Sequence, residues 1–195
     1  YLSLIDRMTL AQGGDAQGWI GRLDLAADNP TVEPALIDPP AHFRPHGLSL
    51  FIDNEGRRTL AVINHPVDRG VGAERIERFV EETPGRFRHA GSFTDPLIAR
   101  PNDLVAVGPG QYYIANDSPP NSGELTNLVF VDADANTART VAGDIRSGGG
   151  INVSPDGRTL YVAETGGNAL RILARDPADG SVTAVAGIDL GTSPD

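Results

Sequence analysis

The sequence has 195 residues, of which 16 are basic and 26 acidic, so its formal net charge is −10. A chain this acidic repels nucleic-acid backbones and anionic lipid, which excludes both as partners and leaves a cation as a suitable one. Every basic residue is arginine and cysteine is absent, which excludes lysine-dependent phosphate binding, thiol nucleophiles and disulfides. The apolar runs are far shorter than the ~18 residues of a membrane-spanning helix, so we expect no membrane span and a soluble protein, cytoplasmic or exported.

Short apolar runs with a period of two, bounded by glycine, proline, aspartate and asparagine, predict an all-β protein almost without helices. Segment 1–45 contains three expected strands, over 1–5, 19–25 and 32–37. The first strand of a four-stranded unit is missing from this segment. We therefore interpret 1–45 as an incomplete blade.

Three four-stranded units follow this segment. The expected strands cover 48–52, 59–63, 75–80 and 87–93, then 104–107, 112–115, 128–131 and 138–141, and finally 151–153, 160–163, 170–174 and 182–188. The units begin near His46, Asn102 and Gly149, and a repeat of roughly 40 to 50 residues with four strands is typical of β-propeller blades. We therefore predict that 1–195 is one partial β-propeller domain of about four blades, with blades starting at about 46, 102 and 149.

Polar residues occupy most of the predicted blade starts. In a propeller the first strand of each blade lines the central channel, so His46, Asn102, Asp103 and Asp195 are expected to converge on one axis. A purely structural strand would favour valine or isoleucine at such positions. Carboxylates and amides gathered in one channel need a neutralising partner, and a hard cation with six to eight oxygen ligands supplies it, so calcium is the natural candidate. A water-filled polar channel is the alternative.

Several ordered motifs resemble a known family. They are RPHGLSLFID at 44–53, VINHP at 62–66, NDLVAVGP at 102–109, AND at 115–117 and GINVSPDG at 150–157. Together, from about residue 40 onward, they resemble the paraoxonase/arylesterase family. The resemblance implies a six-bladed propeller with two calcium ions in its tunnel, which hydrolyses lactones and aryl esters and, in some members, organophosphates.

The resemblance also implies that the chain is a piece of a longer protein. Six blades of about 47 residues need roughly 280 residues, more than the 195 present. We therefore expect the chain alone to be inactive.

Catalytic roles follow from the same resemblance. His46 corresponds to the proposed general base, and His65 corresponds to its partner in a histidine dyad. Asp117 matches an acidic residue near the active centre of the family. A histidine at a strand end such as His65 could instead be satisfied by backbone groups.

The metal ligands are implied in the same way. Asn102 resembles a ligand of the catalytic calcium, and Asp103 resembles a ligand of the buried structural calcium, to which Leu48 would add its backbone carbonyl. Asp195 falls where the family has the aspartate of an Asp-Asn calcium pair. Gly149 departs from the family, which has a ligand asparagine at this position, so either water replaces it or the metal site is weakened.

Two other functions remain open. One is a gluconolactonase-like sugar lactonase on a related propeller, against which the His46 and His65 motifs argue. The other is a propeller that binds a ligand or partner without catalysis, which the glycine at 149 favours. The leading hypothesis is a calcium-dependent hydrolase that takes a small-molecule ester or lactone.

Overall fold

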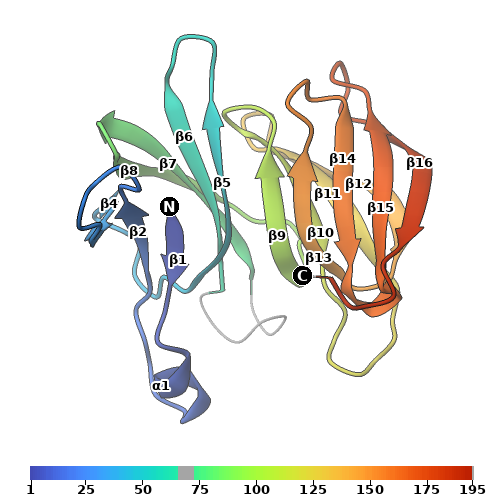
Figure 1. Ribbon diagram of the computed structural model, residues 1–195, viewed down its shortest axis with the longest axis horizontal. Coiled ribbons are helices and arrows are strands. Elements are labelled where there is room, and N and C mark those ends of the chain that lie inside the picture. Colours follow the sequence, from blue (N-terminus) through green and yellow to red (C-terminus); the bar gives the residue numbers. More distant parts are fainter. Residues whose placement is uncertain (66–72, 195) are drawn as a thin grey trace. The chain divides into compact units, whose positions relative to one another are not determined.

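The computed structural model describes residues 1–65 and 73–194 and divides into two compact units, Tyr1–Thr94 and Asp95–Asp195. Each unit contains two β-sheets, and apart from β4 the strands that follow one another within a sheet pair side by side (Figure 1). The prediction of an all-β, propeller-type fold is confirmed. Helical structure in the described part of the chain is confined to α1 (Arg7–Ala11) and the single turn η1 (Thr165–Gly167), and no described helix is long and apolar enough to cross a membrane.

The first unit contains a three-stranded and a five-stranded sheet. The three-stranded sheet has the order β1 (Leu2–Leu4), β2 (Trp19–Leu23), β3 (Val32–Pro34). The five-stranded sheet has the order β4 (Leu36–Ile37), β8 (Arg86–Phe93), β7 (Arg75–Thr83), β6 (Arg58–Asn64), β5 (Pro45–Ile52). Strands β5 to β8 form an antiparallel meander, and β4 adds to its outer edge parallel to β8.

The single strand expected over 32–37 is split between these two sheets, which corrects the prediction. Its first half, β3, pairs with β2, whereas its second half, β4, pairs with β8. The change occurs at the buried Ala35, whose N–H donates to the Ile20 carbonyl at 2.8 Å and whose carbonyl accepts from Phe87 N–H at 2.8 Å. One residue therefore joins both sheets, because Ala35 lies between β3 and β4 and belongs to neither strand, so its N–H and carbonyl bind different neighbours.

The second unit contains two four-stranded antiparallel sheets. One has the order β12 (Thr137–Ile145), β11 (Thr126–Asp132), β10 (Gln111–Asn116), β9 (Pro101–Ala106). The other has the order β13 (Gly148–Val153), β14 (Thr159–Glu164), β15 (Ala169–Arg175), β16 (Val182–Asp189). Such sheets are stable only when their apolar faces are covered, and here the two sheets cover each other.

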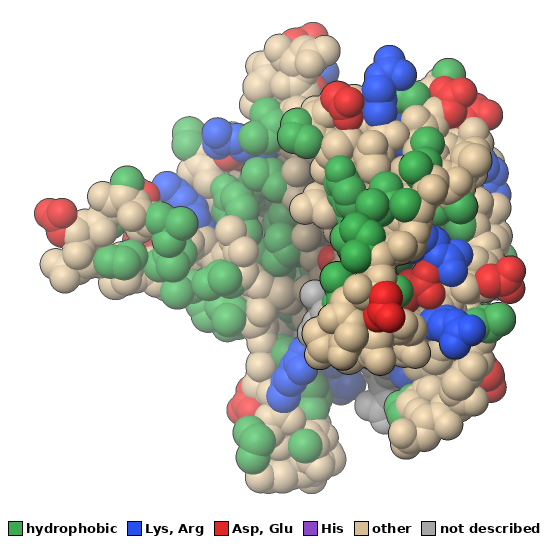
Figure 2. Space-filling view, turned by 45° about the vertical axis from the view of Figure 1, so that its right-hand side comes forward, with side chains coloured by type: hydrophobic (Ala, Val, Ile, Leu, Met, Phe, Trp, Pro, Cys, Tyr) green, Lys and Arg blue, Asp and Glu red, His purple; other side chains and the backbone are tan. Residues whose placement is uncertain are grey.

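Each unit has its own apolar core. In the first, side chains of both sheets pack around Phe43, Phe79 and Phe87. In the second, the core lies around Tyr113 and Leu128, and burial raises the pKa of the Tyr113 hydroxyl, which donates to the Gly180 carbonyl at 2.8 Å. Over the face in view, hydrophobic side chains lie between scattered acidic and basic ones (Figure 2).

Candidate functional site

The first strands of three sheets share a bulge beside the second strand. In the β5–β6 pair, Pro45 faces Asn64 and Leu48 faces Val62, so one extra residue is inserted at His46 and Gly47. The same one-residue shift occurs at Asn102 in the β9–β10 pair and at Gly149 and Gly150 in the β13–β14 pair. Bulges re-aim side chains out of the regular alternation and are common beside active sites. Of the residues predicted at the blade starts, His46, Asn102 and Gly149 therefore lie where the pairing is irregular.

A buried side chain at the end of the second strand holds the start of the first strand at each bulge. Asn64 Oδ1 accepts from Arg44 N–H at 2.8 Å, and Asn116 Oδ1 accepts from Arg100 N–H at 3.1 Å. In the last sheet a carboxylate takes this place: Glu164 Oε2 accepts from Arg146 N–H at 3.0 Å. We call Asn64, Asn116 and Glu164 the clasp residues; all three are buried.

The backbone completes the clasp in the first two of these sheets. The N–H of His65 donates to the Arg44 carbonyl at 3.1 Å, and the N–H of Asp117 donates to the Arg100 carbonyl at 2.8 Å. His65 and Asp117 are thus equivalent positions, each directly after a clasp residue. The repeated clasp explains why the two sequence motifs look alike. Each motif has an asparagine at the strand end, and the clasp that this asparagine forms positions the residue that follows it.

The structure brings His46 and His65 together. Their ring centroids are 5.2 Å apart and the ring planes are inclined by 74°, an edge-to-face contact. His46 is half-buried, whereas His65 is 7% exposed. The pair predicted from the motifs is therefore a structural neighbour pair.

His65 has a second partner that the sequence analysis missed. Its Nδ1 lies 2.5 Å from Oε2 of Glu74, which is 4% exposed. The His65 Nε2 atom is buried and has no hydrogen-bond partner within the described residues. Burying such an atom costs about 1 to 3 kcal/mol, which is the kind of cost that native proteins retain at functional sites.

The signal that could have found Glu74 is strand register. In the β6–β7 hairpin Asn64 faces Arg75, so continuing the antiparallel pairing by one residue places His65 opposite Glu74. No short-range motif joins these two residues, because they are nine positions apart in the chain.

A fully buried carboxylate, Glu77, supports the same strand end. Its Oε1 accepts from Asn64 Nδ2 at 2.9 Å, its Oε2 lies 2.8 Å from His89 Nε2, and Ser92 Oγ also donates to Oε2. Each of these partners comes from a neighbouring strand, so Glu77 joins β6, β7 and β8. The clasp residue beside the histidines is thereby fixed at both ends of its amide.

The predicted metal ligands lie in several places. Asn102 and Asp103 are adjacent and half-buried on β9, and Asp103 Oδ2 accepts from Ile151 N–H at 3.1 Å. Leu48 lies on β5 in the first unit, and Asp195 lies outside the described residues. Carboxylate, amide and carbonyl oxygens are the donor types that calcium takes. Within 1–65 and 73–194 no group of three or more His, Cys, Asp or Glu side chains is arranged to hold a metal.

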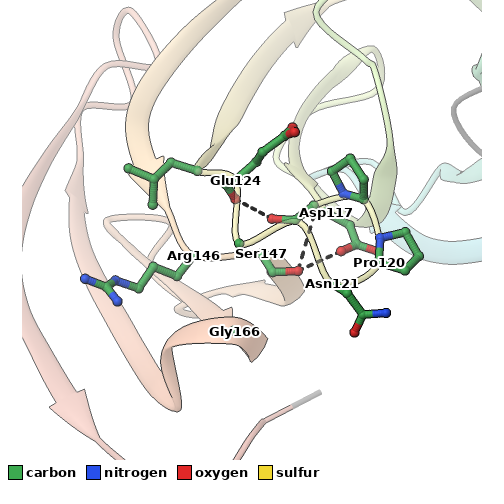
Figure 3. Close-up of a pocket in the computed structure, with 11 residues that line it drawn as sticks. Asp117, Pro120, Asn121, Glu124, Arg146, Ser147 and Gly166 are labelled. Atoms are coloured by element: carbon green, nitrogen blue, oxygen red, sulfur yellow. Dashed lines mark hydrogen bonds between the residues drawn. The ribbon is translucent and has the colours of Figure 1, made fainter.

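Asp117 lines a pocket of the second unit, with a volume of about 410 Å³. Ser147 Oγ donates to Asp117 Oδ1 at 2.7 Å, and the two side chains meet in the pocket while Arg146 extends away from them (Figure 3). Ser147 adopts a φ of +58°, a left-handed conformation that costs a non-glycine residue roughly 1 kcal/mol or more. Such strain is typically retained where a side chain must point in one direction.

Comparison with known proteins now decides the family. The arylesterase family model matches residues 9–195, nearly the whole chain. The chain belongs to the arylesterase family. Among its relatives, serum paraoxonase/arylesterase 2 of Bos taurus is 32% identical over 178 residues, covering 84% of this chain and 49% of that protein. Human serum paraoxonase/arylesterase 1 is 30% identical over 191 residues, covering 91% of this chain and 53% of that protein.

The arylesterase chain thus spans about half the length of these curated relatives. Among solved structures, a candidate 6-phosphogluconolactonase from Bacteroides fragilis superposes with a TM-score of 0.55 at 17% identity, over 91% of this chain and 50% of that one. This likeness supports the propeller-type fold alone.

The clasp makes a stability prediction. Replacing the buried Asn116 by alanine leaves the part-buried Arg100 N–H and Leu97 carbonyl without the side chain that binds them, so we expect a loss of about 1 to 3 kcal/mol of unfolding free energy. The matched control is Asn152→Ala, because Asn152 is exposed on β13 and its side chain binds only the next residue's N–H. Urea denaturation of both variants measures the difference; equal losses below about 0.5 kcal/mol would contradict the clasp.

Proposed function

We propose that the protein carrying this chain is a calcium-dependent hydrolase of lactones and aryl esters, with organophosphates as further substrates. The observation that carries the proposal is the contact between His46 and His65, two residues of the motifs that resemble the family. Membership of the arylesterase family supports ester hydrolysis as the reaction class. The substrate is a small molecule, and the proposal assigns no macromolecular partner.

In this proposal His46 is the general base that removes a proton from the attacking water. A histidine suits this task because its unperturbed pKa range lies near neutral pH. His65, edge-to-face with His46, orients it and shares the proton. Asp117, which lines the pocket of the second unit, is assigned a supporting role as an acidic residue.

Two calcium ions are part of the proposal. Asn102 and Asp195 would hold the catalytic ion, whereas Asp103 and the Leu48 carbonyl would hold the structural one. When bound, the catalytic ion would polarise the substrate carbonyl and stabilise the oxyanion. The oxygen ligands fit calcium in kind, but calcium takes six to eight of them, so further ligands are required beyond those named.

Two alternatives are kept. A gluconolactonase-like sugar lactonase would use the same fold, but the paired histidines favour the arylesterase assignment. A non-catalytic binding propeller is favoured by one feature, the buried Gly149, which offers no side-chain ligand at a bulge where β9 offers Asn102.

The catalytic assignment predicts the effect of His46→Gln. Glutamine keeps a hydrogen-bonding end of similar size but is not a base, so kcat for a phenyl ester or simple lactone should fall by about 10²- to 10⁴-fold, while calcium affinity is retained. His42→Gln is the control, because the His42 side chain is 68% exposed, and it should leave kcat unchanged. Near wild-type kcat in His46→Gln would move the base role to another group, with Asp117 next; collapse of calcium binding would assign His46 to the metal site.

Calcium should also stabilise the protein. A ligand that binds only the folded state at 100 times its Kd adds about 2.7 kcal/mol, and Asp103 carries a charge that the ion would neutralise. For a protein of about twice this chain's length the melting midpoint should rise by about 3 to 5 °C when calcium replaces chelator, and much less with magnesium. An unchanged midpoint would argue against a structural ion.

A further inference from the structure

We infer that Glu74 is a positioning residue for the histidine pair: it fixes His65 as the Nδ1–H tautomer and leaves its Nε2 as the pair's proton acceptor. The inference rests on the proposed function, which uses the pair to move a proton from water. It adds a residue that lies outside every motif that connects the chain with its family.

The contact between His65 and Glu74 sets the tautomer. Nδ1 and Oε2 are 2.5 Å apart, and both side chains are more than nine-tenths buried. An ionised carboxylate only accepts hydrogen bonds, so the proton of this contact belongs to Nδ1. In the neutral ring Nε2 is then a bare lone pair, and no described residue binds it.

A second histidine–glutamate pair in the same unit serves as a reference. His89 meets Glu77 through Nε2, at 2.8 Å, so its proton belongs to the opposite nitrogen from that of His65. His89 packs against Phe79 and takes no part in the His46 contact. The unit therefore contains both tautomers, each held by a buried glutamate, and only the one at His65 leaves Nε2 free inside the protein.

The proton of the attacking water moves along the histidine pair. His46 takes a proton from water as the hydroxyl oxygen bonds to the ester carbonyl carbon. The proton then passes to Nε2 of His65 through a hydrogen bond from His46 that forms in the reacting complex, so His65 becomes an imidazolium while His46 returns to its neutral form. The Glu74 carboxylate stabilises that cation without being protonated, and the proton finally goes to the departing alkoxide or phenoxide oxygen.

The test is ¹⁵N NMR of histidine-labelled protein, because nitrogen shifts distinguish a protonated ring nitrogen from a bare one. The chain has four histidines, so single His→Gln variants of each identify their signals in the spectrum of the protein that carries it. We expect His65 to have a protonated Nδ1 and a bare Nε2, and His89 to have the reverse. In Glu74→Leu the acceptor is lost, so His65 should shift to the Nε2–H tautomer while His89 stays unchanged.

Kinetics separate positioning from folding. Glu74→Leu should lower kcat by about 10²-fold with little change in KM, whereas Glu74→Gln keeps an acceptor and should keep the tautomer while losing about 10-fold, because it lacks the charge. Two results would overturn the inference: a wild-type His65 with a protonated Nε2, or Glu74 variants with full kcat.

The tautomer of wild-type His65 is measurable even if a Glu74 variant fails to fold. A wild-type protein with the expected tautomers but no hydrolysis would instead overturn the proposed function, and with it the acceptor role, while leaving Glu74 as the group that sets the tautomer.

Discussion

One kind of hydrogen bond determines where the candidate residues lie: a backbone N–H near the start of the first strand donates to a buried clasp side chain. It occurs in three sheets, through Asn64, Asn116 and Glu164. These bonds are part-buried, and beside a bulge the β-ladder leaves the N–H without a backbone acceptor, so a side-chain oxygen binds it instead. The residue after the clasp and the residue in the bulge are therefore brought to the same end of each strand pair, which is how His65 comes to lie against His46.

The clasp also explains why the first unit buries so much charge. An amide that holds a backbone N–H with its oxygen has two donors left, and for Asn64 one of them goes to Glu77. That carboxylate then needs further donors, which His89 and Ser92 supply. At Asn116 the amide donors go instead to the Leu97 carbonyl and to Asn127, so no buried carboxylate is needed. The chemistry available at each clasp thus differs although its geometry repeats.

Much of the fold could be predicted because its strands are local patterns. Alternating apolar residues and turns such as the one at Gly157 predict strand positions without knowledge of the partners. The split at Ala35 could not be predicted, because it depends on which sheet each half of the segment meets. Helix α1 was missed for another reason: five residues are too few for a periodic signal, and the Asp6 side chain that caps it acts only once the turn has formed.

The residues of the candidate site could be predicted only where they lie in recognisable sequence motifs. His46 and His65 lie in motifs, and their contact is observed. Glu74 and Glu77 were missed because a segment that reads Glu-Arg-Ile-Glu-Arg looks like an exposed charged edge, whereas in the fold both carboxylates are buried beside the neighbouring strands β6 and β8. The calcium ligands stay a prediction, since Asn102 and Asp103 supply only part of what the ion needs.

The proposed reaction depends most on the histidine pair activating a water molecule that attacks the substrate directly. Single-turnover hydrolysis of an aryl ester in ¹⁸O-labelled water, with enzyme in excess, tests this step through the mass of the released acid. Direct attack predicts one ¹⁸O atom in the acid product after the first turnover. An unlabelled acid, with ¹⁸O found instead in a carboxylate of the protein such as Asp117, would show nucleophilic attack by that carboxylate and contradict direct attack by water.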